Sequence, residues 1–298
     1  MERSLVHSSR IRRAIAILAS SLLLIGWAAT PVDGSTLPTN IRPSLATAAR
    51  DREVLWDDGC LAFEAATAPR HDCVFGDPNG TFRVALVGDS HASAWFPTVE
   101  AVARARGWRL EVFVKVSCVF VDIRLYSRAL GREYRECTAF RNATVARLSA
   151  RPPDLLIINA SHISIFPMRP ADGTLAAEGA AFARMIDRLA ADRKVILADV
   201  PFAGRDVPSC LAAHRTRIEA CAIAHWSASP YGVIEREAAK ATGATRIDLA
   251  ASAWCSATCP VVRWDTIAYR DSHHLTATFA RRLAPALARA LDAAGISP

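Results

Sequence analysis

The chain has 298 residues, of which 51% are hydrophobic and 22% are charged, and its mean hydropathy is +0.16. A chain this long and this apolar can bury a sizeable core, which excludes an intrinsically disordered protein and fits one or two domains. Its formal charge is +7, but its arginines are scattered and form no basic stripe with interleaved aromatic residues. Composition therefore argues against a nucleic-acid partner.

The first 30 residues have the pattern of an export or anchoring signal. Four arginines precede an apolar run over residues 14–29, which contains small residues at Gly26, Ala28 and Ala29. This pattern is typical of a signal peptide cleaved near Ala28, and the same run, if tilted, could remain as an uncleaved membrane anchor. The two alternatives stay open. Because the basic end stays in the cytoplasm, both predict an extracytoplasmic protein, either secreted or anchored by a single N-terminal helix.

Residues 31–59 are predicted to be a linker and lead-in segment. Pro, Thr, Ser, Gly and Asn cluster up to about residue 40, and a short helix is expected over residues 42–52. Residues 60–298 are predicted to form the catalytic domain.

Within that domain, apolar strands alternate with helical patterns. Strands are predicted at residues 82–87, 109–116, 154–159, 194–200 and 245–249. Helices are predicted at residues 92–106, 134–150, 176–192, 212–242 with a break near residue 229, and 276–294. This alternation indicates an α/β fold, a three-layer doubly wound sandwich with a mainly parallel sheet.

The eight cysteines fall into four pairs that are local in the sequence. An even number after an export signal predicts a disulfide framework. We expect sequential pairing, Cys60–Cys73, Cys118–Cys137, Cys210–Cys221 and Cys255–Cys259. The alternative is a zinc site made by Cys255 and Cys259 with His273 and His274, although this spacing matches no common zinc motif.

In open parallel sheets the chemistry lies beyond the carboxyl ends of the strands. Ser90 directly follows the first long strand and opens a helix, whose N-terminal N–H groups can stabilise negative charge on an acyl oxygen. Ser90 is therefore a candidate nucleophile, and a plain helix N-cap is its alternative role. Ser117 and Asn159 also lie at or just beyond strand ends. Asp89 is expected to secure the turn by accepting backbone N–H bonds.

A second candidate motif lies just before the last helix. Asp271 precedes His274 by three residues. At that spacing a carboxylate can accept the imidazole N–H, fix the tautomer, and leave the other ring nitrogen facing a serine. The alternative is that Asp271 caps the helix and that His273 and His274 are solvated.

Together, the two motifs resemble those of the SGNH hydrolase superfamily, in which a GDS block follows the first strand and a late D-x-x-H completes the triad. Here they are Gly88-Asp89-Ser90 and Asp271 to His274. The longer strings over residues 87–92 and 269–275 are most similar to the extracytoplasmic SGNH domain associated with membrane acyltransferases of the acyltransferase-three family.

This resemblance implies roles for the candidate residues. Ser90 would be the nucleophile, His274 the general base, and Asp271 the residue that orients His274. The oxyanion hole would use the Ser90 N–H and Asn159, which is positioned like the third-block asparagine of the superfamily. The second-block glycine is missing, and the backbone N–H of Ser117 is expected to replace it.

Three further residues are candidates for substrate binding. His91 and His162 are expected to line a sugar-binding cleft, and Trp95 to stack on a sugar. The alternatives are ordinary surface or structural histidines and a tryptophan in the core. No cofactor and no metal is expected.

The resemblance implies O-acyl transfer, with acetyl as the expected group, to a cell-envelope glycan. The chain carries one apolar segment and no multi-span domain, so we expect a multi-span membrane acyltransferase as a separate partner and acyl donor. A carbohydrate O-acyl esterase is one alternative. A noncatalytic glycan-binding protein is another, although such a protein has no need of all three triad residues.

Overall fold

The computed structural model of this protein describes residues 35–161, 175–224 and 230–296. The chain divides into two units, residues 1–33 and residues 34–298. The predicted signal peptide or anchor lies outside the described residues. Across the part of the chain that the structure describes, no helix is both long and apolar enough to cross a membrane.

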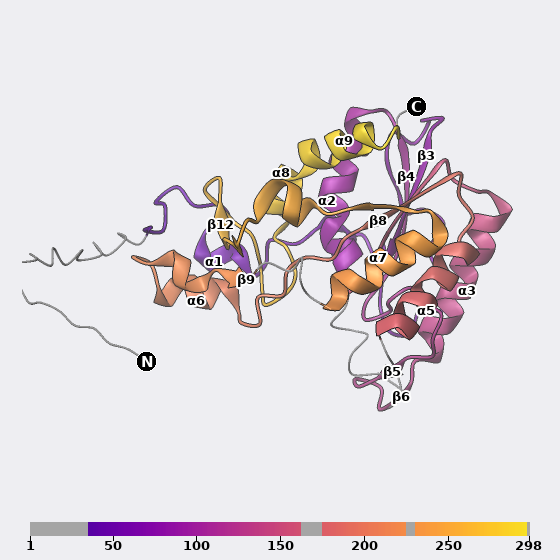
Figure 1. Ribbon diagram of the computed structural model, residues 1–298, viewed down its shortest axis with the longest axis horizontal. Coiled ribbons are helices and arrows are strands. Elements are labelled where there is room, and N and C mark those ends of the chain that lie inside the picture. Colours follow the sequence, from indigo (N-terminus) through magenta and orange to yellow (C-terminus); the bar gives the residue numbers. More distant parts are fainter. Residues whose placement is uncertain (1–34, 162–174, 225–229, 297–298) are drawn as a thin grey trace, which may run out of the picture. The chain divides into compact units, whose positions relative to one another are not determined.

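A seven-stranded sheet forms the centre of the second unit (Figure 1). Its strands follow the order β1-β4-β3-β7-β8-β10 and are parallel, while β2 pairs antiparallel with β4. The strands are β1 Leu61–Ala62, β2 Val74–Gly76, β3 Arg83–Gly88, β4 Arg109–Lys115, β7 Leu155–Asn159, β8 Arg193–Leu197 and β10 Thr245–Ile247. The five predicted strands and the mainly parallel α/β fold are confirmed. The two further strands, β1 and β2, are not among those predicted, because β1 has only two residues inside the loop between Cys60 and Cys73, and β2 is a three-residue segment that ends at Gly76.

Helices cover both faces of this sheet, and the alternation of side chains along each strand explains why (Figure 1). In β3, Val84 and Leu86 join one hydrophobic cluster, whereas Ala85 and Val87 join another on the opposite face. The first cluster packs under α2, α8 and α9, and the second under α3, α5 and α7. These helices are α2 Ser90–Ala105, α3 Arg135–Ala150, α5 Leu175–Arg188, α7 Pro230–Thr242, α8 Ala277–Arg282 and α9 Ala284–Ala293.

Shorter elements lie in the connections. The helical ones are α1 Leu45–Ala48, η1 Val54–Trp56, α6 Val207–Ala213, η3 Ile218–Cys221 and the π-helical turn η5 Ala250–Trp254. Three antiparallel pairs join β5 Tyr126–Ser127 to β6 Arg132–Glu133, β9 Ile223–Ala224 to β11 Thr258–Cys259, and β12 Val262–Arg263 to β13 Thr266–Ile267.

Two helix predictions need correction. The predicted helix over residues 212–242 is wrong in its first half, because the chain there forms η3 and β9. A continuous helix would separate Cys210 from Cys221 by about 16 Å, whereas the disulfide holds their Cα atoms 5.9 Å apart. The predicted C-terminal helix is two helices, because Pro285 stands in the first turn of α9 and cannot continue α8.

Four disulfides each join two segments that are close in the sequence, with partners 4 to 19 residues apart. Sequential pairing is confirmed for Cys60–Cys73, Cys118–Cys137, Cys210–Cys221 and Cys255–Cys259. Since Cys255 and Cys259 are bonded to each other, the alternative zinc site that used their thiolates is wrong. Four disulfides are typical of an oxidising compartment.

The strand order directs attention to one edge of the sheet. Numbered along the chain, the five predicted parallel strands β3, β4, β7, β8 and β10 lie in the order 2-1-3-4-5, so the winding reverses between β3 and β7. Ligands of doubly wound sheets bind at such a reversal, outside the carboxyl ends of the strands. Ser90 and Asn159 stand at these two strand ends.

Candidate active site

The turn between β3 and α2 fixes the position of Ser90. Gly88 has a φ of 155°, and a Cβ there would lie 2.1 Å from the Asn159 carbonyl oxygen, so only glycine fits. Asp89 is fully buried and is the N-cap of α2, where its Oδ1 accepts the His91 N–H at 3.0 Å and its Oδ2 accepts the Ser161 N–H at 3.2 Å. The predicted role of Asp89 in securing the turn is confirmed. Asp89 rather than Ser90 caps the helix, which leaves the Ser90 hydroxyl for other contacts.

Ser90, His274 and Asp271 meet although the serine lies 184 residues before the histidine. The Ser90 Oγ lies 3.0 Å from His274 Nε2, and His274 Nδ1 lies 2.8 Å from Asp271 Oδ2. The other oxygen of Asp271 accepts the backbone N–H groups of His273 and His274 at 2.8 and 2.7 Å. The carboxylate thus holds both the turn and the ring, and Nε2 faces the hydroxyl with its lone pair.

The electrostatics of this trio suit a neutral histidine beside a charged carboxylate. Burial lowers the pKa of His274 below its ordinary value, and the hydrogen bond to Asp271 offsets only part of this effect. Burial alone would raise the pKa of Asp271, but its hydrogen bonds and the charge of His274 hold that pKa well below the ordinary value. His274 can therefore accept a proton near neutral pH.

A buried ion pair between Glu53 and Arg270 holds the loop that carries Asp271. Glu53 is 3% exposed, and its Oε2 accepts a hydrogen bond from Arg270 Nη1 at 2.8 Å. Its Oε1 accepts from Trp56 Nε1 at 2.9 Å and from the Ser93 hydroxyl of α2. This network ties the residue before Asp271 to the helix that Ser90 opens.

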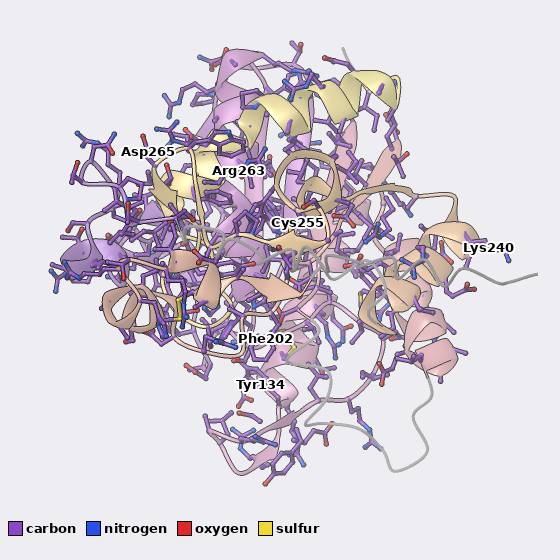
Figure 2. The ribbon with its side chains drawn as sticks, turned by 60° about the vertical axis from the view of Figure 1, so that its left-hand side comes forward. Tyr134, Phe202, Lys240, Cys255, Arg263 and Asp265 are labelled. Atoms are coloured by element: carbon purple, nitrogen blue, oxygen red, sulfur yellow. A yellow bond between two sulfur atoms is a disulfide. The ribbon has the colours of Figure 1, made fainter. Side chains whose placement is uncertain are left out.

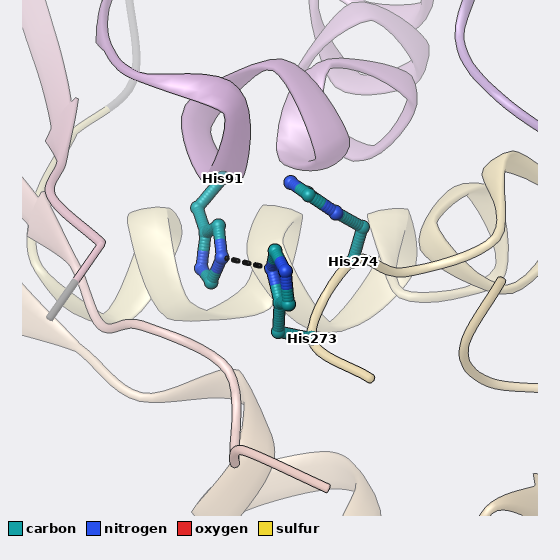
Figure 3. Close-up of side chains that lie close together, drawn as sticks. All are labelled: His91, His273 and His274. Carbon is teal, nitrogen blue, oxygen red and sulfur yellow. Dashed lines mark hydrogen bonds between the residues drawn. The ribbon is translucent and has the colours of Figure 1, made fainter. Parts of the chain in front are cut away.

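A second aspartate–histidine pair lies next to the trio. His91 Nδ1 is 2.5 Å from Asp199 Oδ1, and both residues are buried, with 2% and 3% exposed. Figure 3 shows the other ring nitrogen of His91 facing His273, with His91 Nε2 and His273 Nδ1 3.0 Å apart. The His273 ring centroid lies 4.0 Å from that of His274. Asp199 is not among the predicted site residues, although its place two residues beyond the end of β8 is a usable signal.

The three predicted substrate-binding residues fall in different places. His91 lies in the site but is buried, so its contacts are with protein groups. Trp95 is 1% exposed and packs in the core beneath α2, the alternative that the sequence analysis left open. His162 lies outside the described residues.

Of the predicted oxyanion residues, Ser90 begins α2, whereas Asn159 and Ser117 lie at or just beyond the ends of the two strands that flank β3. Asn159 pairs with Gly88 across the sheet and is fully buried, and its Nδ2 donates to the Leu197 carbonyl at 2.9 Å. Ser117 follows β4 and is exposed, with a φ of 51°. This left-handed conformation favours glycine, the residue that the superfamily places in its second block.

The three histidines are also the cluster best suited to a metal ion. One ring nitrogen of each of His91, His273 and His274 lies within 4.8 Å of the others. Five of their six ring nitrogens, all except His273 Nε2, already hydrogen-bond to one another, to Ser90 or to a carboxylate of the described residues. A metal ion would have to displace the bond between Ser90 and His274, so the cluster fits a hydrogen-bond network better than a resident metal.

Comparison with solved structures supports the fold. The periplasmic domain of a lipopolysaccharide acetyltransferase from Salmonella ser. Paratyphi A matches with a TM-score of 0.54 and 16% identity, over 74% of this chain and 85% of that chain. The salicylyl-acyltransferase SsfX3 from a tetracycline biosynthetic pathway matches with a TM-score of 0.39 and 13% identity, over 74% of this chain and 57% of that one. At such identities the first likeness shows a shared fold alone.

Sequence comparison identifies the family. No curated protein matches the sequence significantly. The profile of a family described as SGNH domain (fused to AT3 domains) matches residues 58–289, which is most of the chain. The protein therefore belongs to this family of SGNH domains.

Proposed function

We propose that this protein is a serine-dependent O-acyltransferase that passes a small acyl group, acetyl, to a hydroxyl of a cell-envelope glycan. Membership of the SGNH family supports an enzyme of the hydrolase or acyltransferase kind. The observation that carries the proposal is the chain of contacts from Ser90 Oγ to His274 Nε2 at 3.0 Å and from His274 Nδ1 to Asp271 at 2.8 Å. A nucleophile, a base and an orienting carboxylate in this order are the parts that acyl transfer needs.

In the first half of the proposed reaction, Ser90 Oγ attacks the acyl carbonyl while His274 Nε2 takes the hydroxyl proton. The bond between the acyl carbon and the donor then breaks, and His274 returns the proton to the leaving group. Asp271 keeps the proton on Nδ1 of His274 and stabilises the imidazolium that forms. The product is an acyl ester on Ser90.

In the second half, a sugar hydroxyl gives its proton to His274 and attacks the acyl ester. The new ester bond forms on the sugar, the bond to Ser90 breaks, and Oγ recovers a proton from His274. Water in place of the sugar gives free acid, which is the esterase reaction. The same trio serves both reactions, so the acceptor distinguishes them.

For the oxyanion we propose three donors, the Ser90 N–H, the Ser117 N–H and the side chain of Asn159. The first N–H groups of a helix have no partner within the helix and carry its positive end. Ser90 begins α2, Asn159 ends β7, and Ser117 lies two residues beyond the end of β4; β4 and β7 are the strands on either side of β3. Nδ2 of Asn159 retains a second hydrogen beside the one that it donates to Leu197.

We propose an extracytoplasmic location and a multi-span membrane acyltransferase as the source of acyl groups. Four disulfides, the basic and apolar N-terminus, and the family's association with AT3 domains support this proposal. The Salmonella protein of similar fold is a lipopolysaccharide acetyltransferase, and its domain is periplasmic. This likeness favours an envelope glycan as the acceptor.

The test is trapping of the acyl group on the purified protein. Incubation with p-nitrophenyl acetate should release nitrophenol and add one acetyl group to the peptide that contains Ser90, as read by mass spectrometry. Ser90→Ala should lose both signals while its circular dichroism and melting temperature stay close to those of the parent. Full turnover by a folded Ser90→Ala protein, or acetyl on another residue, would overturn the proposal.

A further inference from the structure

An exposed aromatic ring lies beside the histidine cluster. Phe202, labelled in Figure 2, follows β8 and has 43% of its surface exposed, which is unusual for a phenylalanine. Its ring centroid lies 6.4 Å from that of His273, and the His273 ring lies 4.0 Å from that of His274. A row of three rings thus runs outward from the base that faces Ser90.

The backbone on both sides of Phe202 is fixed to the loop that carries His273. The Tyr269 hydroxyl donates to the Pro201 carbonyl at 2.6 Å, and Tyr269 itself is fully buried. On the other side, the Ala203 N–H donates to the Ser272 carbonyl at 3.0 Å. The exposed ring is therefore held in place relative to His273, and little entropy is lost when a ligand packs against it.

His273 is oriented by the buried pair behind it. Asp199 holds Nδ1 of His91 at 2.5 Å, so a proton stays on that nitrogen, and Nε2 of His91 faces Nδ1 of His273 at 3.0 Å. When His91 carries both protons, it donates to His273 Nδ1, and a neutral His273 must then carry its own proton on Nε2. No residue that the structure describes hydrogen-bonds to His273 Nε2.

The charges around the two rings favour this arrangement. Burial alone would lower the pKa of His91, but Asp199, Asp89 and Asp271 together raise it above the ordinary value. Burial and the neighbouring histidines lower the pKa of His273 to about 4. These shifts favour the protonated form of His91 and the neutral form of His273.

We propose that Phe202 and His273 form the acceptor subsite, which binds one sugar ring of the glycan with its apolar face on Phe202 and a hydroxyl or ring oxygen accepting from His273 Nε2. This inference rests on the proposed function, since it names what the same site recognises. His91 and Asp199 are positioning residues, because they act on the sugar only through the orientation of His273.

A sugar fits this row of rings for two chemical reasons. The acceptor hydroxyl must come within reach of His274 Nε2 to give up its proton, so the rest of the sugar has to lie against the groups just outside His274. A pyranose has an apolar face of C–H groups and an edge of oxygens, which match an exposed aromatic ring and an adjacent N–H donor. An acyl chain would use the ring but has no partner for His273.

The first experiment measures transfer. The full chain is given p-nitrophenyl acetate with soluble muropeptides or with glucose and mannose oligosaccharides, and acetylated glycan and free acetate are counted. Phe202→Ala should lower the ratio of glycan ester to acetate about tenfold. The matched control is Trp264→Ala, which removes an aromatic side chain of similar exposure, 42%, at a separate position, the β12–β13 turn. Its ratio should stay that of the parent once its melting temperature confirms folding.

The second experiment tests the positioning pair. His273→Ala should raise the KM for the sugar about tenfold, as expected for the loss of one hydrogen bond, and His273→Gln, which keeps a side-chain N–H donor, should recover most of it. Asp199→Asn should raise the sugar KM in the parent but not in His273→Ala, so that the two changes are not additive. Additive effects would show that Asp199 acts elsewhere and overturn its positioning role.

A binding measurement separates failure of this inference from failure of the proposed function. Saturation-transfer NMR with the same sugars on Ser90→Ala reports the subsite without chemistry. Sugar signals that weaken strongly in Ser90→Ala/Phe202→Ala support the subsite even if the parent only hydrolyses esters. No sugar signal with Ser90→Ala, or equal signals with and without Phe202, would overturn it. If Phe202→Ala changed the KM for p-nitrophenyl hexanoate but not for sugars, Phe202 would contact the acyl chain of the donor instead, which would also overturn the subsite.

Discussion

The site contains two aspartate–histidine pairs with the same chemistry in different settings. Asp271 and His274 are three residues apart on one partly exposed loop. Asp199 and His91 are 108 residues apart, join the end of β8 to the first turn of α2, and are buried. In each pair the carboxylate faces Nδ1, so Nε2 of each histidine is directed elsewhere, toward Ser90 or toward His273.

This difference in setting separates two roles. A ring that exchanges protons during the reaction has to meet the substrate, and His274 lies on the accessible loop. A ring that orients a neighbour is best kept away from solvent, where its hydrogen bonds do not compete with water. We infer that the partly exposed pair acts in proton transfer and the buried pair in recognition.

The largest expected effect contrasts the two carboxylates directly. Asp271→Asn should lower kcat for p-nitrophenyl acetate by about 10⁴, because an amide can stabilise the wrong tautomer of His274. Asp199→Asn should lower the same kcat less than tenfold, because it acts through His273 only. Stopped-flow or steady-state rates measure both, with circular dichroism as the control for folding. Equal losses from the two variants would remove the distinction between the pairs.

The same contrast explains what could be read from the sequence. The three-residue spacing of Asp271 and His274 is visible in the chain, and β3 and β7 are visible as nearly continuous apolar runs. Asp199 and His91 face each other only because β8 and β3, which leads into α2, both flank β7 in the sheet. A strand order is a property of the folded chain, so the partner of His91 was not visible to a pattern search.

Other misses have equally specific causes. The sequence places Trp95 shortly after Ser90 on a predicted helix, which makes it a candidate for sugar stacking. It does not show that Trp95 lies on the face of α2 that packs into the core. Phe202 lies in a loop without periodicity, and its exposure results from the hydrogen bonds of Pro201 and Ala203 to a loop about 70 residues later. Long-range contacts of this kind set exposure, and the sequence does not display them.

The second largest effect is a loss of stability in the segment that follows Asp199 of the buried pair. The segment after Asp199 runs into α6, which the Cys210–Cys221 disulfide closes, whereas no disulfide spans residues 260–296, which include the Asp271 loop. Replacing both cysteines by serine should lower the free energy of unfolding by about 3 kcal/mol, because an 11-residue separation is no longer closed in the unfolded chain. Urea unfolding measures this, and Ser209→Ala on the same helix is the control, with a change of about 0.5 kcal/mol or less. An unchanged midpoint would contradict the prediction.

A smaller effect is the opposite pH dependence of the two histidines. The folded-state pKa of His91 is raised, so its contribution to stability is complete below pH 6.5 and is lost as the pH rises through the folded pKa. The folded-state pKa of His274 is lowered, so the unfolded chain takes up the proton first and stability falls as the pH drops below 6.5. The free energy of unfolding in urea would be measured between pH 5 and 8 for the parent, His91→Gln and His274→Gln. As the pH rises, the difference between each variant and the parent should change in opposite directions for the two variants. If both differences changed in the same direction, the pKa values of His91 and His274 would not be shifted in opposite directions.

The smallest effect concerns Ser117, whose proposed role as an oxyanion donor uses its backbone N–H and involves neither aspartate–histidine pair. Ser117 has a φ of 51° and is exposed, so its Cβ adds strain of about 1–2 kcal/mol. Ser117→Gly relieves that strain but adds freedom to the unfolded chain, and the net change in stability should be within about 1 kcal/mol. If its backbone N–H is the oxyanion donor, Ser117→Gly and Ser117→Ala should both keep ester turnover within about twofold, because both retain that N–H. Loss of turnover in a folded Ser117→Ala protein would assign the role to the hydroxyl instead.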